Sequence, residues 1–148
     1  ITAALCRCHP GVPILAVEME GELAHCLRER FPMIEVRAGA AHEVLCESQR
    51  GAVAAVLISS LPFRSLPPRL RIRSSMAIER FLIERPPSRL VQYTYLPWVP
   101  FHLRFGESLR WRRLEAVWQN VPPAWVWELT SSNAESGCSQ MPLSGTAT

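Results

Sequence analysis

The sequence contains no lysine and no aspartate: all 16 basic residues are arginine and all 13 acidic residues are glutamate. Mechanisms that depend on a lysine amine or an aspartate carboxylate are therefore excluded, unless another residue takes over that role. Arginine carries a planar guanidinium that matches phosphate oxygens in pairs, whereas lysine offers a point charge. A phosphate-bearing partner is one interpretation of this composition, and a coding bias is the other. The net charge of +3 does not decide between them.

Long hydrophobic runs are also missing. No apolar segment approaches the ~20 residues of a membrane-spanning helix, and no secretory signal is recognisable. We therefore predict a protein without a transmembrane segment. The chain starts at Ile1, within a segment whose pattern predicts a helix, so we expect it to be a piece of a longer protein.

The cysteines show neither zinc-ligand nor redox spacing. The segment Cys6-Arg7-Cys8-His9 is the nearest approach to a metal site, but it lacks a second pair of ligands. We expect no metal, and instead small buried thiols in a reducing compartment, which is the cytoplasm. There are five cysteines, an odd number: Cys6, Cys8, Cys26, Cys46 and Cys138.

Strand and helix patterns alternate along the chain, whose length suits one domain. This alternation predicts an α/β fold with a mostly parallel sheet, right-handed crossovers and an antiparallel hairpin at one edge. The apolar strands at 13–20 and 52–59 are expected to be buried. The full expectation is strands at 13–20, 33–39, 52–59 and 88–97, a hairpin at 107–129, helices at 1–8, 21–31, 41–50 and 67–85, and a disordered tail from Thr130.

Function is expected where these strands end, because ligands of parallel sheets bind beyond the carboxyl ends of the strands. Glu18 ends the first strand, where an acid can bind both hydroxyls of a ribose or simply stay exposed in a loop. Ser59-Ser60-Leu61-Pro62-Phe63 ends a central strand. Pro62 stiffens that loop, which either presents polar groups to a substrate or is an ordinary turn. Gly39 and the segment 92–95 mark the other two ends.

Every tryptophan lies late in the chain, interleaved with arginine. Tryptophan beside arginine suits a lipid headgroup interface, and it also suits stacking on nucleic-acid bases. Alternation in a hairpin would instead direct half of these rings into the core. The residues are Trp98, Trp111, Trp118, Trp125 and Trp127, with Arg104, Arg110, Arg112 and Arg113 between them.

Four segments together carry a resemblance: "LAVEMEGELAHCLRERFP" from Leu15, "VLISSLPFRSLPP" from Val56, "RLVQYTYLP" from Arg89 and "VWQNVPPAWVWEL" from Val117. They resemble the bacterial phospholipid N-methyltransferases, relatives of the rRNA adenine dimethylases among the class I S-adenosylmethionine-dependent methyltransferases. The segments look like the second strand with its helix, the loop after the fourth strand, the fifth strand and the closing hairpin. The resemblance implies a Rossmann-like sheet without its first strand, a partial methyltransferase domain at 1–129 and a tail at 130–148.

The activity implied is methyl transfer from S-adenosylmethionine to the amine of phosphatidylethanolamine or a related phospholipid. The protein would work in the cytoplasm, peripherally at the inner face of the membrane. Carried over to this chain, the resemblance implies Glu18, Met19, Gly39, Ala40 and Ser59 as cofactor-binding residues, Ser60, Leu61 and Tyr95 as catalytic residues, and Pro62 and Phe63 as substrate-binding residues.

The sequence departs from the family in two places. The glycine-rich loop that follows the first strand is absent, and Gly39 is followed by Ala40 where the family often has an acid for the adenine. We therefore expect this chain to bind the cofactor weakly. Two alternatives stay open: an rRNA adenine N6-methyltransferase, disfavoured because Ser60 replaces the asparagine of that family's tetrad, and a non-catalytic remnant that serves as a binding module.

Overall fold

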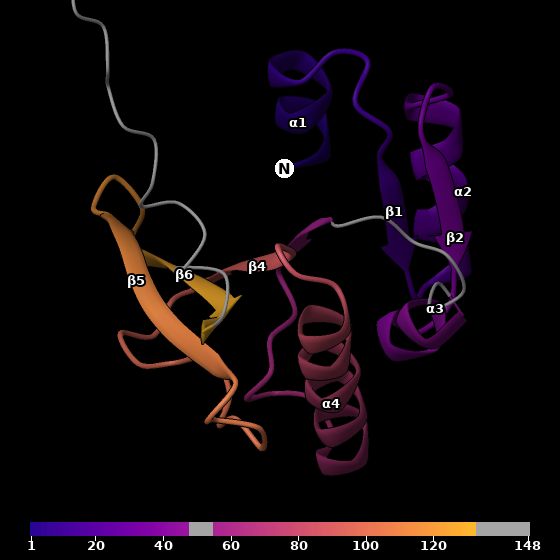
Figure 1. Ribbon diagram of the computed structural model, residues 1–148. Helices are drawn as coiled ribbons and strands as arrows, with labels where there is room; N and C mark the ends of the chain where they lie inside the picture. Colours follow the sequence, from indigo (N-terminus) through magenta and orange to yellow (C-terminus); the bar gives the residue numbers. More distant parts are fainter. Residues whose placement is uncertain (48–54, 133–148) are drawn as a thin grey trace, which may run out of the picture. The chain divides into compact units, whose positions relative to one another are not determined.

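The computed structural model describes residues 1–47 and 55–132. They belong to two compact units, Ile1–Arg50 and Gly51–Thr148. Both combine strands with helices (Figure 1), so the predicted α/β class is confirmed. Within the described residues the strands form two sheets, one of two parallel strands and one of four that combines a parallel pair with antiparallel pairs.

The first unit contains two parallel strands and three helices. Strand β1 pairs with β2 in a register that sets Leu15 opposite Glu35 and Glu18 opposite Ala38. Pro32 follows α2 and prevents its continuation, as proline does in a helix. The elements are α1 (Thr2–Cys8), β1 (Leu15–Glu18), α2 (Gly21–Arg30), β2 (Glu35–Ala38) and α3 (Ala41–Glu47).

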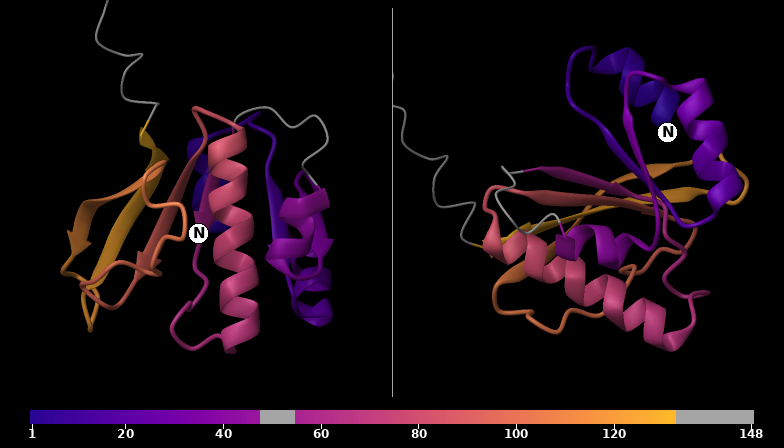
Figure 2. Two further views of the ribbon diagram at one scale, coloured as in Figure 1. Left: turned by 60° about the horizontal axis from the view of Figure 1, so that its bottom comes forward. Right: turned by 90° about the vertical axis from the view of Figure 1, so that its right-hand side faces the viewer.

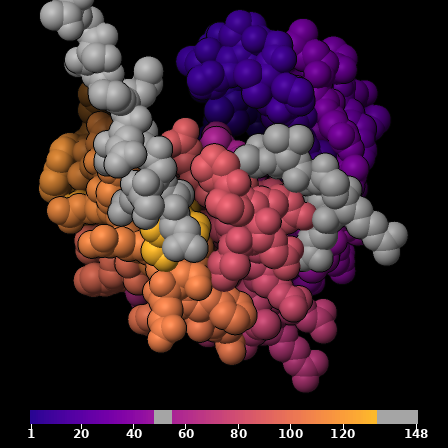
Figure 3. All heavy atoms as spheres, in the orientation of Figure 1, coloured from indigo at the N-terminus to yellow at the C-terminus, as the bar shows by residue number. Residues whose placement is uncertain are grey.

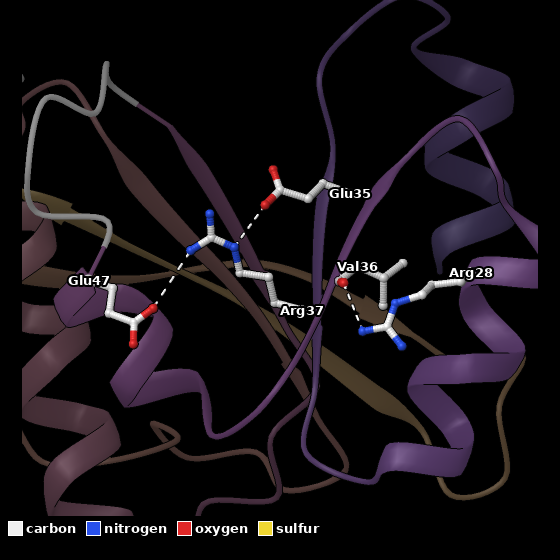
Figure 4. Close-up of polar contacts among 5 residues, drawn as sticks. All are labelled: Arg28, Glu35, Val36, Arg37 and Glu47. Carbon is white, nitrogen blue, oxygen red and sulfur yellow. Dashed lines mark hydrogen bonds and ion pairs between the residues drawn. The ribbon is translucent and has the colours of Figure 1, made fainter.

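Polar side chains connect the elements of this unit (Figure 4). The guanidinium of Arg28 on α2 donates to the carbonyl oxygen of Val36 on β2 at 3.1 Å. Arg37 pairs with Glu35 at 2.8 Å on its own strand and with Glu47 on α3 at 3.8 Å. All of these pairs are exposed, so each adds less than about 1 kcal/mol to the stability of the unit.

The second unit is a mixed sheet in the order β3-β4-β6-β5. Strands β3 and β4 are parallel, with Ser59 opposite Gln92, and the last two strands form the predicted antiparallel hairpin. Pro68 begins α4 at a position that proline tolerates in a first turn. The elements are β3 (Val56–Ser59), α4 (Pro68–Glu84), β4 (Arg89–Thr94), β5 (Leu109–Val117) and β6 (Ala124–Ser131).

Helix α4 runs along one face of the four-stranded sheet (Figure 2), and the core of the unit lies between them. Leu82 of the helix, Leu90 of β4 and Leu129 of β6 are completely buried. The carboxylate of Glu79 on α4 is buried too, and it accepts the backbone N–H groups of Arg104 at 2.8 Å and Phe105 at 2.9 Å. The segment before β5 therefore lies directly against α4 (Figure 3).

Several expectations about burial were wrong. The apolar strands β1 and β3 are not buried: Val17 is 36% exposed and Val56 is 51% exposed. Exposed and half-buried residues alternate along both strands, so the described residues leave one face of each strand open. The thiols of Cys8, Cys26 and Cys46 are exposed and that of Cys6 is half-buried, so the prediction of buried thiols fails for all four.

The sequence analysis placed the start of the disordered tail at Thr130, which is too early. Thr130 and Ser131 continue β6, because both pair with β5, opposite Arg110 and Leu109. The rest of the predicted tail from residue 133, with Cys138, lies outside the described residues, and so do the ends of the predicted helix 41–50 and strand 52–59.

Candidate functional site

A pocket of about 310 Å³ lies at the carboxyl ends of the parallel strands β3 and β4. This is the edge where ligands of parallel sheets bind. All of the predicted catalytic and substrate-binding residues line it. The lining residues are Ser60, Leu61, Pro62, Phe63, Arg64, Ser65, Gln92, Tyr93, Thr94, Tyr95, Leu96 and Pro100.

The loop that follows β3 is held by its own hydrogen bonds. The hydroxyl oxygen of Ser59 accepts the N–H of Leu61 at 3.2 Å, a turn that serine commonly forms. The carbonyl oxygen of Pro62 accepts the N–H groups of Ser65 at 2.8 Å and Leu66 at 3.1 Å. Ser59, predicted to bind the cofactor, thus fixes the loop, and the loop shapes one wall of the pocket.

Gln92 joins the two strands at the pocket. It lies in the segment 92–95 where function was expected, although it is not among the predicted catalytic or binding residues. Its side chain is completely buried. The amide nitrogen donates to the carbonyl oxygens of Leu61 at 3.2 Å and Tyr93 at 2.8 Å. Because both partners only accept, the orientation of the amide is fixed by its surroundings. The signal in the sequence is an amide within an apolar strand, "RLVQYTY".

The amide oxygen of Gln92 is left without a hydrogen-bond partner among the described residues, although it is buried. A buried acceptor without a donor costs about 1–3 kcal/mol. Native proteins pair almost all such groups. Because Gln92 lines the pocket, this oxygen is a candidate acceptor for a donor on a bound ligand.

Aromatic rings form the rest of the wall and the rim. Phe63 is buried, with its ring 4.6 Å from that of Phe101. It contributes a fixed apolar wall. Tyr95 is 53% exposed at the rim, and its ring meets that of Tyr93 edge-on at 6.0 Å. The pocket therefore combines a buried aromatic wall at Phe63 with an exposed ring at Tyr95.

The polar groups of the pocket include few that are free for a ligand. The carbonyl oxygen of Leu61 already accepts Gln92 and the N–H of Phe63, at 2.9 Å, so both of its lone pairs are engaged. The hydroxyl of Ser60 is exposed and makes no hydrogen bond within the described part of the chain. Arg64 is the one charged residue in the lining, and no carboxylate or imidazole accompanies it.

The remaining predicted cofactor residues gather at the equivalent edge of the first unit. The N–H of Gly39 donates to the carbonyl oxygen of Glu18 at 2.9 Å. One carboxylate oxygen of Glu18 accepts the N–H of Glu20 at 3.1 Å, which orients the group and leaves its other oxygen for a ligand. Met19 is exposed, while Gly39 and Ala40 are half-buried. The two predicted groups of site residues thus belong to different units.

No cluster of three or more metal-binding side chains occurs among residues 1–47 and 55–132. In the same residues, no helix is long and apolar enough to span a membrane. Comparisons with protein-family models, curated proteins and solved structures found no match.

Proposed function

We propose that this chain is the acceptor-binding part of a phospholipid N-methyltransferase with a Rossmann-like sheet. The pocket at the ends of β3 and β4 carries the proposal. It combines one cation, Arg64, with the uncharged acceptors Ser60 and Gln92 and the phenol of Tyr95. A phosphate and a nearby amine are the two polar groups of a phosphatidylethanolamine headgroup, and this set of side chains complements both.

The strand pairing supports the sheet type. In the resemblance, β1 and β2 correspond to the second and third strands, and β3 and β4 to the fourth and fifth. The observed pairs are β1 with β2 and β3 with β4, and both pairs are parallel. Parallel pairing of these neighbouring strands supports the correspondence.

In this proposal the pocket residues bind and orient the amine. Arg64 pairs with the phosphate of the headgroup, since a guanidinium binds phosphate through parallel N–H groups. The Gln92 amide oxygen and the Ser60 hydroxyl accept the N–H groups of the amine. Because no lining residue is a carboxylate or imidazole, the ammonium loses its proton to solvent before it reacts. Phe63 and Pro62 exclude water and align the nitrogen, which is most of the work in such a reaction.

The first unit offers a partial fit to the cofactor. The Glu18 oxygen that does not accept the N–H of Glu20 is suited to ribose hydroxyls, and the backbone of Gly39 and Ala40 to the adenine, but Ala40 contributes no side-chain acceptor. S-Adenosylmethionine would supply an electrophilic methyl group on sulfur. We assign the protein to the cytoplasm, at the inner membrane surface, as this substrate requires.

The test uses the gene product that contains these residues. It is incubated with methyl-labelled S-adenosylmethionine and vesicles of phosphatidylethanolamine, and the extracted lipid is counted. We expect labelled lipid, and none with phosphatidylcholine, whose nitrogen is fully methylated. Ser60→Ala should lower the rate, and the exposed Ser108→Ala, outside the pocket, should not. Unlabelled lipid from a protein that binds the cofactor would contradict the proposal.

A non-catalytic binding module is the second candidate. Ala40 favours it, because the residue after Gly39 offers no acid for the adenine. Titration calorimetry with S-adenosylmethionine separates the candidates. Measurable binding by the chain would refute the module, and Glu18→Ala should then weaken that binding.

A further inference from the structure

We propose that the end of the second unit that holds the pocket docks on an anionic lipid surface. We define this pocket end as the loop after β3, the start of α4, the segment after β4 and the turn between β5 and β6. The strand register brings these parts together. Thr94, the last residue of β4, pairs with Trp125, and Val117, the last residue of β5, pairs with Ala124. The turn at 118–123 therefore lies at the same end of the sheet as the pocket.

Large apolar side chains are exposed at the pocket end. Val121 is 98% exposed and Trp118 is 70% exposed, both in the turn between β5 and β6. Tyr95, Leu96 and Trp98 are exposed in the segment that follows β4. Isolated apolar residues on a surface are ordinary, but a group at one end marks an interaction site.

The charge of the pocket end is positive. The loop after β3 and the first turns of α4 carry only basic charges, because no glutamate occurs between Ser59 and Ile78. Arg113 on β5 adds to them, and Glu115 is the acid nearest to the turn in sequence. Basic residues beside exposed apolar ones attract anionic headgroups, while the apolar groups enter the acyl boundary. The exposed basic residues of this loop and of the first turns of α4 are Arg64, Arg69, Arg71 and Arg73.

Arginine and tryptophan are in direct contact here. The guanidinium carbon of Arg64 lies 5.7 Å from the ring centroid of Trp98, and that of Arg113 lies 5.1 Å from Trp125. The ring of Trp118 meets Trp125 edge-on at 5.9 Å. A ring with an apolar body and a polar N–H suits the headgroup layer, and the neighbouring guanidinium can bind a lipid phosphate there.

The aliphatic residues favour lipid over nucleic acid. Leu96 and Val121 cannot stack on bases, which is how aromatic rings bind single-stranded nucleic acid. Both side chains gain by transfer into hydrocarbon. Val121 stands at the tip of the turn, followed by Pro122 and Pro123, and is the most exposed large apolar residue described. The docking surface goes beyond the proposed reaction, because adhesion to lipid needs neither cofactor nor methyl transfer.

Vesicle flotation of the full chain tests the proposal. Vesicles of phosphatidylcholine with phosphatidylglycerol should carry the protein upward, and vesicles of phosphatidylcholine alone should carry much less. The double variant Trp118→Ala with Val121→Ser should bind at least about tenfold more weakly, because it removes most of the turn's apolar contact. Phe105→Ala is the matched control. This residue is exposed and apolar but precedes β5, at the opposite end of the sheet, so binding should be unchanged.

Two further results bear on the proposal. Val121→Ser alone keeps the test valid if the double variant is misfolded, because this side chain touches little of the protein; its binding should also fall. The proposal is overturned if the wild-type chain does not float with anionic vesicles, or if both turn variants float like the wild type. It is also overturned if a single-stranded RNA oligonucleotide binds and anionic vesicles do not. Since no step is catalytic, an inactive protein that floats would contradict the proposed reaction and leave the docking surface standing.

Discussion

The side-chain amide of Gln92 donates a hydrogen bond of 3.2 Å to the carbonyl oxygen of Leu61. This bond joins the middle of the β4 segment to the loop after β3, which are neighbours in the sheet but 31 positions apart in sequence. It ties the loop to β4, in addition to the loop's own hydrogen bonds and the packing of Phe63 on Phe101. The shape of the proposed acceptor site therefore depends in part on one buried amide.

Replacing that amide should destabilise the second unit. Gln92→Met keeps a similar volume but removes two hydrogen bonds, those to the carbonyl oxygens of Leu61 and Tyr93. Each is worth about 0.5–1.5 kcal/mol, and removal of the unpaired amide oxygen offsets part of their loss, so we expect a net loss of about 1–2 kcal/mol in the free energy of unfolding. Tryptophan fluorescence during urea unfolding measures it, since all five tryptophans lie in this unit. Gln119→Met, in the exposed turn, is the control and should change stability by less than about 0.5 kcal/mol. Equal stabilities would contradict the assigned role.

Glu79 should be required for the segment before β5. Glu79→Leu removes the acceptor of two backbone N–H groups, those of Arg104 and Phe105, and we expect a loss of about 2–5 kcal/mol. Glu79→Gln keeps one acceptor oxygen, so its loss of stability should be smaller than that of Glu79→Leu. The exposed Glu84→Leu on the same helix should have little effect. Faster amide exchange at Arg104 and Phe105 in Glu79→Leu, but not in Glu84→Leu, would identify the cause.

The elements could be predicted from the sequence because proline and glycine mark their ends. Pro32 follows α2, Pro67 precedes α4, and Pro86 follows it, so the helices were found almost at their observed bounds. The strand ends followed from the same signals. The pocket loop was found for this reason, since Ser59 ends an apolar run and Pro62 excludes a helix directly after it.

The neighbours of each strand could not be predicted in the same way. An apolar run such as Val56–Ser59 indicates a strand, but it does not say which strands flank it. Val56 and Ile58 point to the same face of β3, and the described residues leave that face open, so both are exposed where burial was expected. Gln92 lies in the segment 92–95 where function was expected, but its role could not be predicted because its partner, the Leu61 carbonyl, is distant in sequence. Only the register of β3 against β4 brings the two together.

The ion pairs of Glu128 should stabilise the sheet. This carboxylate is buried on β6 and accepts two hydrogen bonds from Arg112 on β5, the shorter at 2.6 Å, while Arg89 on β4 lies 3.7 Å away. Arg112→Leu leaves the buried charge with one distant partner, and we expect a loss of about 1–3 kcal/mol. Arg110→Leu on the same strand is the control, because no ion pair of Arg110 occurs among the described residues. Urea unfolding at two salt concentrations compares them, and an equal effect of both variants would refute the role of the pair.

Two glycines of the first unit should respond in opposite directions to alanine. Gly39 has a φ of 151°, which side chains rarely adopt, although a Cβ there would meet no atom closer than 4.0 Å. Gly39→Ala should therefore cost about 1–2 kcal/mol through backbone strain alone. Gly21 begins α2 with open space around it, so Gly21→Ala should stabilise by up to about 1 kcal/mol. Amide hydrogen exchange in β1 and β2 reports both, because these strands belong to the same unit. If Gly39→Ala exchanged no faster than the wild type, the positive φ would not be what retains glycine at the end of β2.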